Sequence, residues 1–243
     1  MSIINSIQAI QIIDSRGTPT VSCKVILDNG IYATSMVPSG ASTGSREALE
    51  LRDHNSDFMG KGVSKAVANI NEVIAPTLIG MDVTNQQEID EKMLALDGTS
   101  SKSKLGANAI LGVSLAVLNA GSKVLKQPLY KYINQVFFNI NGEKPKMRMP
   151  TPMLNIINGG EHANNNIDIQ EFMIMPVGAD NFSQAMQWSI EIYSDLKNIL
   201  NSNGLSTSVG DEGGFAPNLQ SNQEAIELII QAIRNNGLTE GKD

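Results

Sequence analysis

The chain has 243 residues and a mass of 26.1 kDa, a size that suits one large domain or two ordinary ones. Hydrophobic residues make up 41% of it and charged residues 18%, so it can bury a sizeable core and is not a disordered acidic tail. Its net charge of −7 argues against a nucleic-acid-binding face, which needs basic residues to displace counterions from phosphates. The single cysteine, Cys23, excludes a disulfide framework and any multi-cysteine zinc site.

Two stretches of the sequence bear on its location. Residues 1–17 have no basic region ahead of an apolar run, so we expect no secretory leader. The most apolar stretch, 105–118, is interrupted by Asn108 and stops at Asn119, short of the ~18 apolar residues that a membrane span needs. We therefore expect a soluble, cytoplasmic globular protein with no membrane insertion.

The chain opens with extended segments. Residues 3–14 are rich in isoleucine, and the runs 21–27 and 31–37 flank an Asp-Asn-Gly sequence at 28–30. An Asn-Gly pair between two β-branched runs is a strong hairpin signal, because both residues tolerate a positive φ. The opening is therefore an antiparallel β-meander, and a Gly/Ser-rich loop over 38–45 follows it.

Helical patterns follow the meander. We expect helices over 47–53, 63–77, 86–96 and 105–125, with Pro128 starting a further turn or helix. Strands followed by helices indicate an α+β domain. Four prolines and glycines among mixed charges then make 139–152 a linker.

The second half has fewer elements. The best-marked is its last helix, where Ser221 and Glu224 form a capping box, 225–233 is apolar with helical spacing, and Gly237 lies at the C′ position. Before it we expect strands over 152–157 and 172–177, a long amphipathic helix over 182–200, and a glycine-rich turn over 210–214.

The loop over 38–45 contains a literal G-x-S-x-G sequence in Gly40, Ser42 and Gly44, as in the nucleophile elbow of serine hydrolases, and His162 lies downstream as that fold requires. However, the elbow needs a buried parallel strand before the serine, and here the preceding strand closes an antiparallel hairpin. The loop also lacks the Lys-Ser/Thr pair of a phosphate-binding loop. The pattern alone favours a surface loop.

A second polar segment, Asn158-Gly-Gly-Glu-His162, directly follows a predicted strand. The glycines let the backbone pass close to a ligand, and a histidine there can hydrogen-bond or move protons. A lone loop histidine is more often an incidental surface residue, and His54 fits that description.

Two further segments are acidic. In 168–172, strand alternation places Gln170 and Phe172 on one face and Glu171 on the other. In 209–217, two acids followed by two glycines form a tight turn. Each signal is modest alone, because such carboxylates are often only solvated. Together they concentrate negative charge at strand ends, which calls for a cation or raised pKa values and is how general acids arise; the acids are Glu161, Asp168, Glu171, Asp211 and Glu212.

Six segments together resemble the signature sequences of the enolase family, in that family's order and spacing. They are Asp14-Ser-Arg-Gly17, residues 38–44, residues 102–112, residues 158–162, Gln170-Glu-Phe-Met173 and residues 210–214. The resemblance extends over the whole chain. It implies an N-terminal α+β domain over 1–138 and, over 146–243, the incomplete start of an enolase-type α/β (TIM-like) barrel.

The resemblance also implies a function. Enolases are glycolytic lyases that interconvert 2-phosphoglycerate and phosphoenolpyruvate with Mg²⁺. By match to the family's motifs, Glu212 is the general acid, Glu171 acts beside it, and His162 and Gln170 contact the substrate. Ser42 is implied as a ligand of the second Mg²⁺, with the ligands of the first beyond the chain end. This interpretation displaces the hydrolase one.

The resemblance implies partners and limits as well. The family uses the region around 14–17 for dimer contact, so a homodimer or higher homo-oligomer is implied, in the cytoplasm or also secreted or on the cell surface. A barrel takes ~250 residues, whereas 146–243 supplies 98. We therefore expect a truncated chain that is inactive alone. The alternative is a non-catalytic fragment that acts in dimerisation or surface binding.

Overall fold

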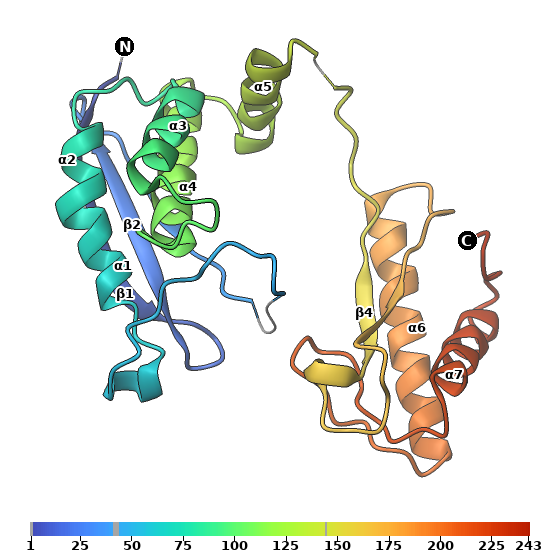
Figure 1. Cartoon of the computed structure of the whole chain (residues 1–243). Helices are drawn as coiled ribbons and strands as arrows, with labels where there is room; N and C mark the ends of the chain where they lie inside the picture. The colour runs from blue at the N-terminus through green and yellow to red at the C-terminus, as the bar shows by residue number, and fades with distance from the viewer. Residues whose placement is uncertain (1, 41–43, 144) are drawn as a thin grey trace. The chain divides into compact units, whose positions relative to one another are not determined.

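The structure is a computed structural model that describes residues 2–40, 44–143 and 145–243. It divides into two compact units, Met1–Met147 and Arg148–Asp243 (Figure 1). Each unit is described here by itself.

The first unit is built on a three-stranded antiparallel sheet. Its strands β1 (Ile4–Ile13), β2 (Pro19–Leu27) and β3 (Tyr32–Met36) lie in chain order. The β2–β3 turn contains the Asn-Gly pair, with Gly30 at φ +80° and its N–H bonded to the carbonyl of Leu27 at 3.0 Å. The predicted meander is therefore confirmed.

Helices of the first unit cover one face of this sheet. The helix α4 (Ala107–Val124) packs on β2 and β3, and it approaches so closely that a Cβ at Gly112 would lie 3.2 Å from Val37. A continuous helical stretch made of α1 (Ser64–Ala68), the π-helical η2 (Asn69–Ile74) and α2 (Ala75–Leu78) lies along β1 (Figure 1). The remaining elements are η1 (Asp57–Gly60), α3 (Gln86–Asp97) and α5 (Leu129–Asn141).

Among the described residues, α4 is the one helix whose length and apolar composition would allow it to cross a membrane. Half of it is buried inside the first unit, where Ala109, Val113 and Val117 are fully enclosed in the core. Packing against the sheet accounts for its apolar character.

The predicted helix over 47–53 is wrong, because residues 48–54 are irregular. Their backbone groups bond to distant partners instead: Leu49 N–H donates to the carbonyl of Ser101 at 2.7 Å, and the Leu49 carbonyl accepts from Ala107 N–H at 2.8 Å. The side chain of Asn108 pairs with both backbone groups of Leu51 at 3.1 Å. These tertiary bonds satisfy the groups that helix formation would have used.

The segment between the two units follows α5, which ends at Asn141 with Gly142 in the left-handed conformation at φ +75°. The described residues from 143 to 153 form no helix or strand, and most are exposed. The predicted linker thus begins later than residue 139, because the last turn of α5 includes 139–141.

The second unit contains a two-stranded antiparallel sheet of β4 (Leu154–Asn158) and β5 (Glu171–Ile174). Between these strands lies the 3₁₀ turn η3 (Gly160–His162), and a parallel bridge joins Ile157 to Phe215. The helices α6 (Phe182–Ser202) and α7 (Asn222–Asn235) pack on each other, and their apolar faces share one core with β4 and β5.

The ends of α7 follow the local signals in the sequence. Ser221 Oγ accepts from the N–H of Glu224 at 3.2 Å, while the Glu224 carboxylate accepts from Gln220 N–H at 2.5 Å rather than from Ser221. At the other end, Gly237 at φ +73° donates to Arg234 at 2.9 Å and Leu238 N–H donates to Ile233 at 3.2 Å. This pair of bonds is the Schellman motif.

Candidate active site

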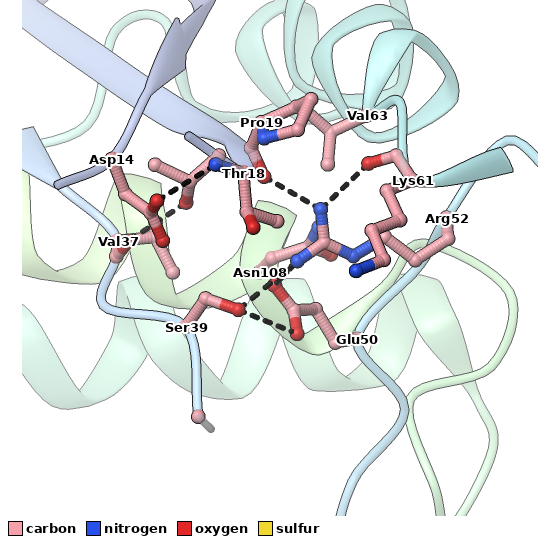
Figure 2. A network of polar contacts seen from close by, with 12 residues as sticks. Asp14, Thr18, Pro19, Val37, Ser39, Glu50, Arg52, Lys61, Val63 and Asn108 are labelled. Carbon is pink, nitrogen blue, oxygen red and sulfur yellow. Dashed lines mark hydrogen bonds and ion pairs between the residues drawn. The ribbon is translucent and has the colours of Figure 1, made fainter. Parts of the chain in front are cut away.

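Polar contacts around Arg52 fix the start of the Gly/Ser-rich segment in the first unit (Figure 2). Its guanidinium donates to the carbonyls of Pro19 at 2.5 Å and Lys61 at 2.7 Å, to Ser39 Oγ at 3.0 Å and to Glu50 at 2.6 Å. Ser39 Oγ in turn donates to the other oxygen of Glu50 at 3.1 Å. The Arg52 side chain therefore connects Ser39 to Pro19, the first residue of β2.

Ser42, the expected Mg²⁺ ligand, lies outside the described residues. The strand before it, β3, pairs antiparallel with β2. A nucleophile elbow requires a parallel strand at this point, so the hydrolase interpretation of Ser42 lacks its structural context.

In the second unit, His162 is the centre of a cluster at the ends of the two strands. It is 3% exposed and ends the turn η3. Gln170 Nε2 lies 2.6 Å from His162 Nε2. With the amide of Gln170 as donor, His162 Nε2 accepts and the ring carries its proton on Nδ1. That edge of the ring faces the acidic groups of the site.

Two carboxylates converge on the same ring nitrogen. Glu171 Oε1 and Glu212 Oε2 each lie 3.5 Å from His162 Nδ1, and their side chains are 28% and 39% exposed. Glu171 begins β5, whereas Glu212 lies in the turn after residue 209, so the cluster joins three separate segments. Asn155 Nδ2 on β4 also lies 3.5 Å from Glu212 Oε2. A buried imidazole thus faces two half-exposed acids, an arrangement that can hold and move protons.

The sequence placed Gln170 and Glu171 on opposite faces of a strand, and this is wrong for Gln170. The strand begins only at Glu171, with Phe172 and Ile174 buried and Met173 exposed. Gln170 lies in the preceding bend, where alternation does not apply, and it reaches His162 together with Glu171.

The paired glycines allow close contacts within the chain. A Cβ at Gly159 would lie 2.5 Å from the carbonyl of Ile169, and one at Gly214 would lie 2.7 Å from Asn158 Oδ1 and 2.9 Å from the N of Ile157. The missing side chains therefore let the chain's own segments approach one another.

The other predicted acids are not part of this trio. Asp168 accepts a hydrogen bond from Asn222 at 3.4 Å, which ties it to the start of α7. Asp211 is exposed, and its backbone N–H donates to the carbonyl of His162 at 2.9 Å. Glu161 is exposed beside His162 in the sequence. The structure therefore selects two of the five carboxylates.

Ligand atoms of His162, Glu171 and Glu212 all lie within 4.8 Å of one another, as a metal site would require. Two carboxylate oxygens and one imidazole nitrogen do not match Mg²⁺, which prefers an all-oxygen octahedron at ~2.0–2.1 Å. A mixed nitrogen and oxygen set is more typical of transition metals. The trio therefore fits acid–base chemistry better than a Mg²⁺ site.

Two residues of the site escaped the sequence reasoning. Asn155 contacts Glu212, and Tyr193 on α6 donates to the carbonyl of Gly213 at 2.9 Å while its ring stacks on Phe215. Burial raises the pKa of Tyr193. Neither residue lies in a polar motif, so the sequence carried no signal for them beyond the polarity of Asn155 within a strand.

Fold and site together define an α+β unit followed by a strand-and-helix unit that carries an acid–base cluster at its strand ends. Residues 4–133 match the family model described as "Enolase, N-terminal domain". Residues 146–242 match the model described as "Enolase, C-terminal TIM barrel domain". The chain therefore belongs to the enolase family, and its second unit is part of that family's barrel domain.

One curated relative gives the same result. The chain is 54% identical over 242 residues to a protein named "Enolase" from Desulfotalea psychrophila (strain LSv54 / DSM 12343). The match covers 99% of this chain and 55% of the relative, so the chain spans about half the length of the curated relative that it matches.

Proposed function

We propose that this chain forms the acid-bearing part of an enolase, which reversibly dehydrates 2-phospho-D-glycerate to phosphoenolpyruvate with Mg²⁺. The observation that carries the proposal is the convergence of Glu171 and Glu212 on one buried imidazole edge, each at 3.5 Å. Family membership supplies the reaction, and the cluster supplies a chemical reason for these residues.

The proposed reaction requires stabilisation of negative charge and protonation of the leaving hydroxide, and the cluster can supply the proton. Removing the proton next to a carboxylate concentrates negative charge, and hydroxide then leaves poorly unless an acid protonates it. We assign Glu212 as that acid, because it is 39% exposed and can reach a substrate while His162 lies behind it. Glu171 shares the charge and orients the hydroxyl, and His162 and Gln170 contact the substrate.

The remaining demands fall to other groups. Mg²⁺, when bound, would neutralise negative charge on the substrate. We propose Mg²⁺ because the chain belongs to the enolase family. We assign Ser42 as a ligand of the second Mg²⁺, and we assign the ligands of the first to the part of the relatives that this chain does not cover. Enolase-superfamily sites use a lysine or histidine as the base. Lys242 is the only lysine after Lys197 and lies in an exposed tail turn, so we assign the base to the part of the relatives that this chain does not cover. The chain by itself is therefore expected to show no turnover.

We also propose a cytoplasmic homo-oligomer, as family membership suggests. Among the residues that the structure describes, nothing favours the alternative of a non-catalytic dimerisation or surface-binding module.

The test replaces the acid in a full-length form of this protein. Glu212→Gln keeps the shape of the side chain but cannot donate the proton, so turnover should fall by ~10² or more, while exchange of the substrate's α-proton largely survives. Phosphoenolpyruvate absorbance and solvent isotope exchange measure the two steps. The matched control is Glu227→Gln, an exposed glutamate on α7. Normal turnover of Glu212→Gln would overturn the assignment.

A further inference from the structure

We propose that Asn158 is a positioning residue of the site, whose buried amide holds the Glu212 turn and the Gln170–Glu171 segment in register around His162. Asn158 touches none of the proposed reacting atoms. Its role for turnover rests on the proposed function, whereas its role in the geometry does not.

The side chain of Asn158 connects both halves of the cluster. It ends β4 and is 0% exposed. Its Oδ1 accepts from the N–H of Gly214 at 2.9 Å, two residues after Glu212. Its Nδ2 donates to the carbonyl of Gln170 at 3.4 Å, directly before Glu171. One amide therefore bridges the two segments that bring carboxylates to His162.

The backbone of Asn158 binds the same surroundings. Its N–H donates to the carbonyl of Phe215 at 2.9 Å, and its carbonyl accepts from the side chain of Asn165 at 2.8 Å. Two glycines pack on its side chain, since a Cβ at Gly210 would lie 2.8 Å from Asn158 Cβ and one at Gly214 would lie 2.7 Å from its Oδ1. Contacts this close allow the turn little freedom to shift relative to the strand.

An amide suits this position for a chemical reason. The Gly214 N–H needs an acceptor and the Gln170 carbonyl needs a donor, and a carboxamide offers both at once. An aspartate would only accept when ionised, and a buried charge without a charged partner is unfavourable. Alanine would leave a buried N–H without its acceptor.

Asn166 provides a matched comparison on the same loop. Its Nδ2 donates to the carbonyl of Leu219 at 2.6 Å, and its Oδ1 accepts from Leu219 N–H at 3.0 Å. This amide also connects the 158–167 segment to the segment after residue 209, but its partner, Leu219, is seven positions after Glu212 in the chain. A residue that only holds the loop in place should behave like Asn166, and a positioning residue should not.

The first measurement uses the 243-residue chain. Its two histidines, His54 and His162, give two sets of imidazole resonances in ¹H–¹³C spectra. Asn158→Ala should shift the His162 resonances and leave those of His54 in place, while Asn166→Ala should leave both unchanged. Unfolding in urea, followed by the single tryptophan Trp188, reports whether each variant is folded.

The second measurement uses a full-length form. Asn158→Ala should lower kcat about 10- to 100-fold, because small misplacements of reacting groups have effects of that size, with KM changed by less than about threefold. Asn166→Ala should change kcat less than about twofold. If Asn158→Ala does not fold, Asn158→Asp keeps the acceptor for Gly214 and removes the donor to Gln170. Its buried charge should lower the unfolding midpoint, and the same kcat loss should appear under conditions in which Trp188 fluorescence shows the variant to be folded.

The outcomes separate the two proposals. Unchanged His162 resonances and kcat in the folded Asn158 variants, or equal losses in the Asn166 variant, would overturn the positioning role. If the full-length wild type fails to dehydrate 2-phosphoglycerate while the His162 resonances still respond only to Asn158, then the proposed function fails and the positioning of the cluster stands.

Discussion

Acidic side chains have different surroundings in the two units. In the first unit, Asp53 and Asp97 are buried and accept hydrogen bonds from several N–H and O–H groups, such as Ser64 and Lys65 for Asp53. In the second unit, the site acids are partly exposed and face an imidazole. A carboxylate surrounded by backbone donors therefore holds the chain together, and a half-exposed one beside a histidine is available for chemistry.

The cores differ as well. The first unit closes one core under a three-stranded sheet, while the second builds its core on two strands and the helices α6 and α7. Each unit carries its own reporter, because the single cysteine, Cys23, is buried in the first unit and the single tryptophan, Trp188, lies in the second. Burial raises the pKa of the Cys23 thiol to about 12, so labelling requires unfolding of that unit.

The largest expected effect is from Phe215→Ala. Phe215 is 2% exposed, its ring lies 4.4 Å from that of Tyr193, and its N–H donates to Ile156 at 2.9 Å. Truncation should destabilise the second unit by about 3–5 kcal/mol, measured by Trp188 fluorescence in urea. The Cys23 labelling curve should not move, and the exposed control Phe182→Ala should leave both curves unchanged. A parallel shift of the Cys23 curve would mean that the units unfold together.

Gly121→Ala tests the first unit in the same way. A Cβ at Gly121 would lie 2.4 Å from the hydroxyl oxygen of the buried Tyr132, so α4 and α5 must separate or Tyr132 must move. Overpacking should cost about 1–3 kcal/mol, which exceeds the helix-propensity gain of alanine. Cys23 labelling in urea measures the loss, and Trp188 should not respond. The ring carbons of Tyr132 would also lie 2.7 and 2.8 Å from the added Cβ, so Tyr132→Ala is the variant that removes the clash. Gly121→Ala should cost nothing in that background, and an equal loss with and without Tyr132 would place the clash elsewhere.

Asp53→Asn tests a structural carboxylate. Burial raises the pKa of Asp53, but hydrogen bonds from Lys65 and Ser64 outweigh burial and lower it overall. Losing one of these bonds should destabilise the first unit by ~1 kcal/mol at pH 7. Because the folded-state pKa is lowered, the wild-type advantage is complete above the unfolded value of about 3.9 and disappears as the pH falls through the folded value.

Cys23 labelling in urea at a series of pH values measures this difference. Asp57→Asn, an exposed neighbour, is the control and should leave the labelling curve at pH 7 unchanged. A constant difference between wild type and Asp53→Asn down to the acid range would contradict the role of the charge.

The smallest effect is expected from Asp90→Asn. Burial raises the pKa of Asp90, and Gln86 Nε2 lies 3.1 Å from both of its oxygens. Asparagine removes the buried charge, which relieves its desolvation, but it keeps only one of the two oxygens that accept from Gln86 Nε2, so the two effects nearly cancel. The variant should be more stable than wild type by less than ~1 kcal/mol at pH 7.

The sign follows from the raised pKa. The contribution of Asp90 to the free energy of unfolding is fully present below the unfolded pKa of about 3.9. It is lost as the pH rises through the folded pKa, so wild type and Asp90→Asn should become equally stable in acid. Glu91→Gln changes the equivalent exposed pair, in which Gln87 donates to Glu91, and it should have no such effect. A stabilisation of equal size in Glu91→Gln would show that burial is not the cause.

Local signals in the sequence determined the elements whose bonds close within a few residues. The Asn-Gly turn fixed the hairpin of β2 and β3, and the Ser221 cap and Gly237 fixed both ends of α7. The motif residues His162, Glu171 and Glu212 could also be named from the sequence, because each lies in a recognisable segment.

Tertiary structure alone decided the rest. Residues 48–54 are not helical because their partners, Ser101, Ala107 and Asn108, lie about 50 residues away. The convergence of two carboxylates on His162 depends on Asn158 and on glycines that allow the strand and the turn to touch. Such contacts join segments that no short pattern relates, since their free energy is gained only when the whole unit packs.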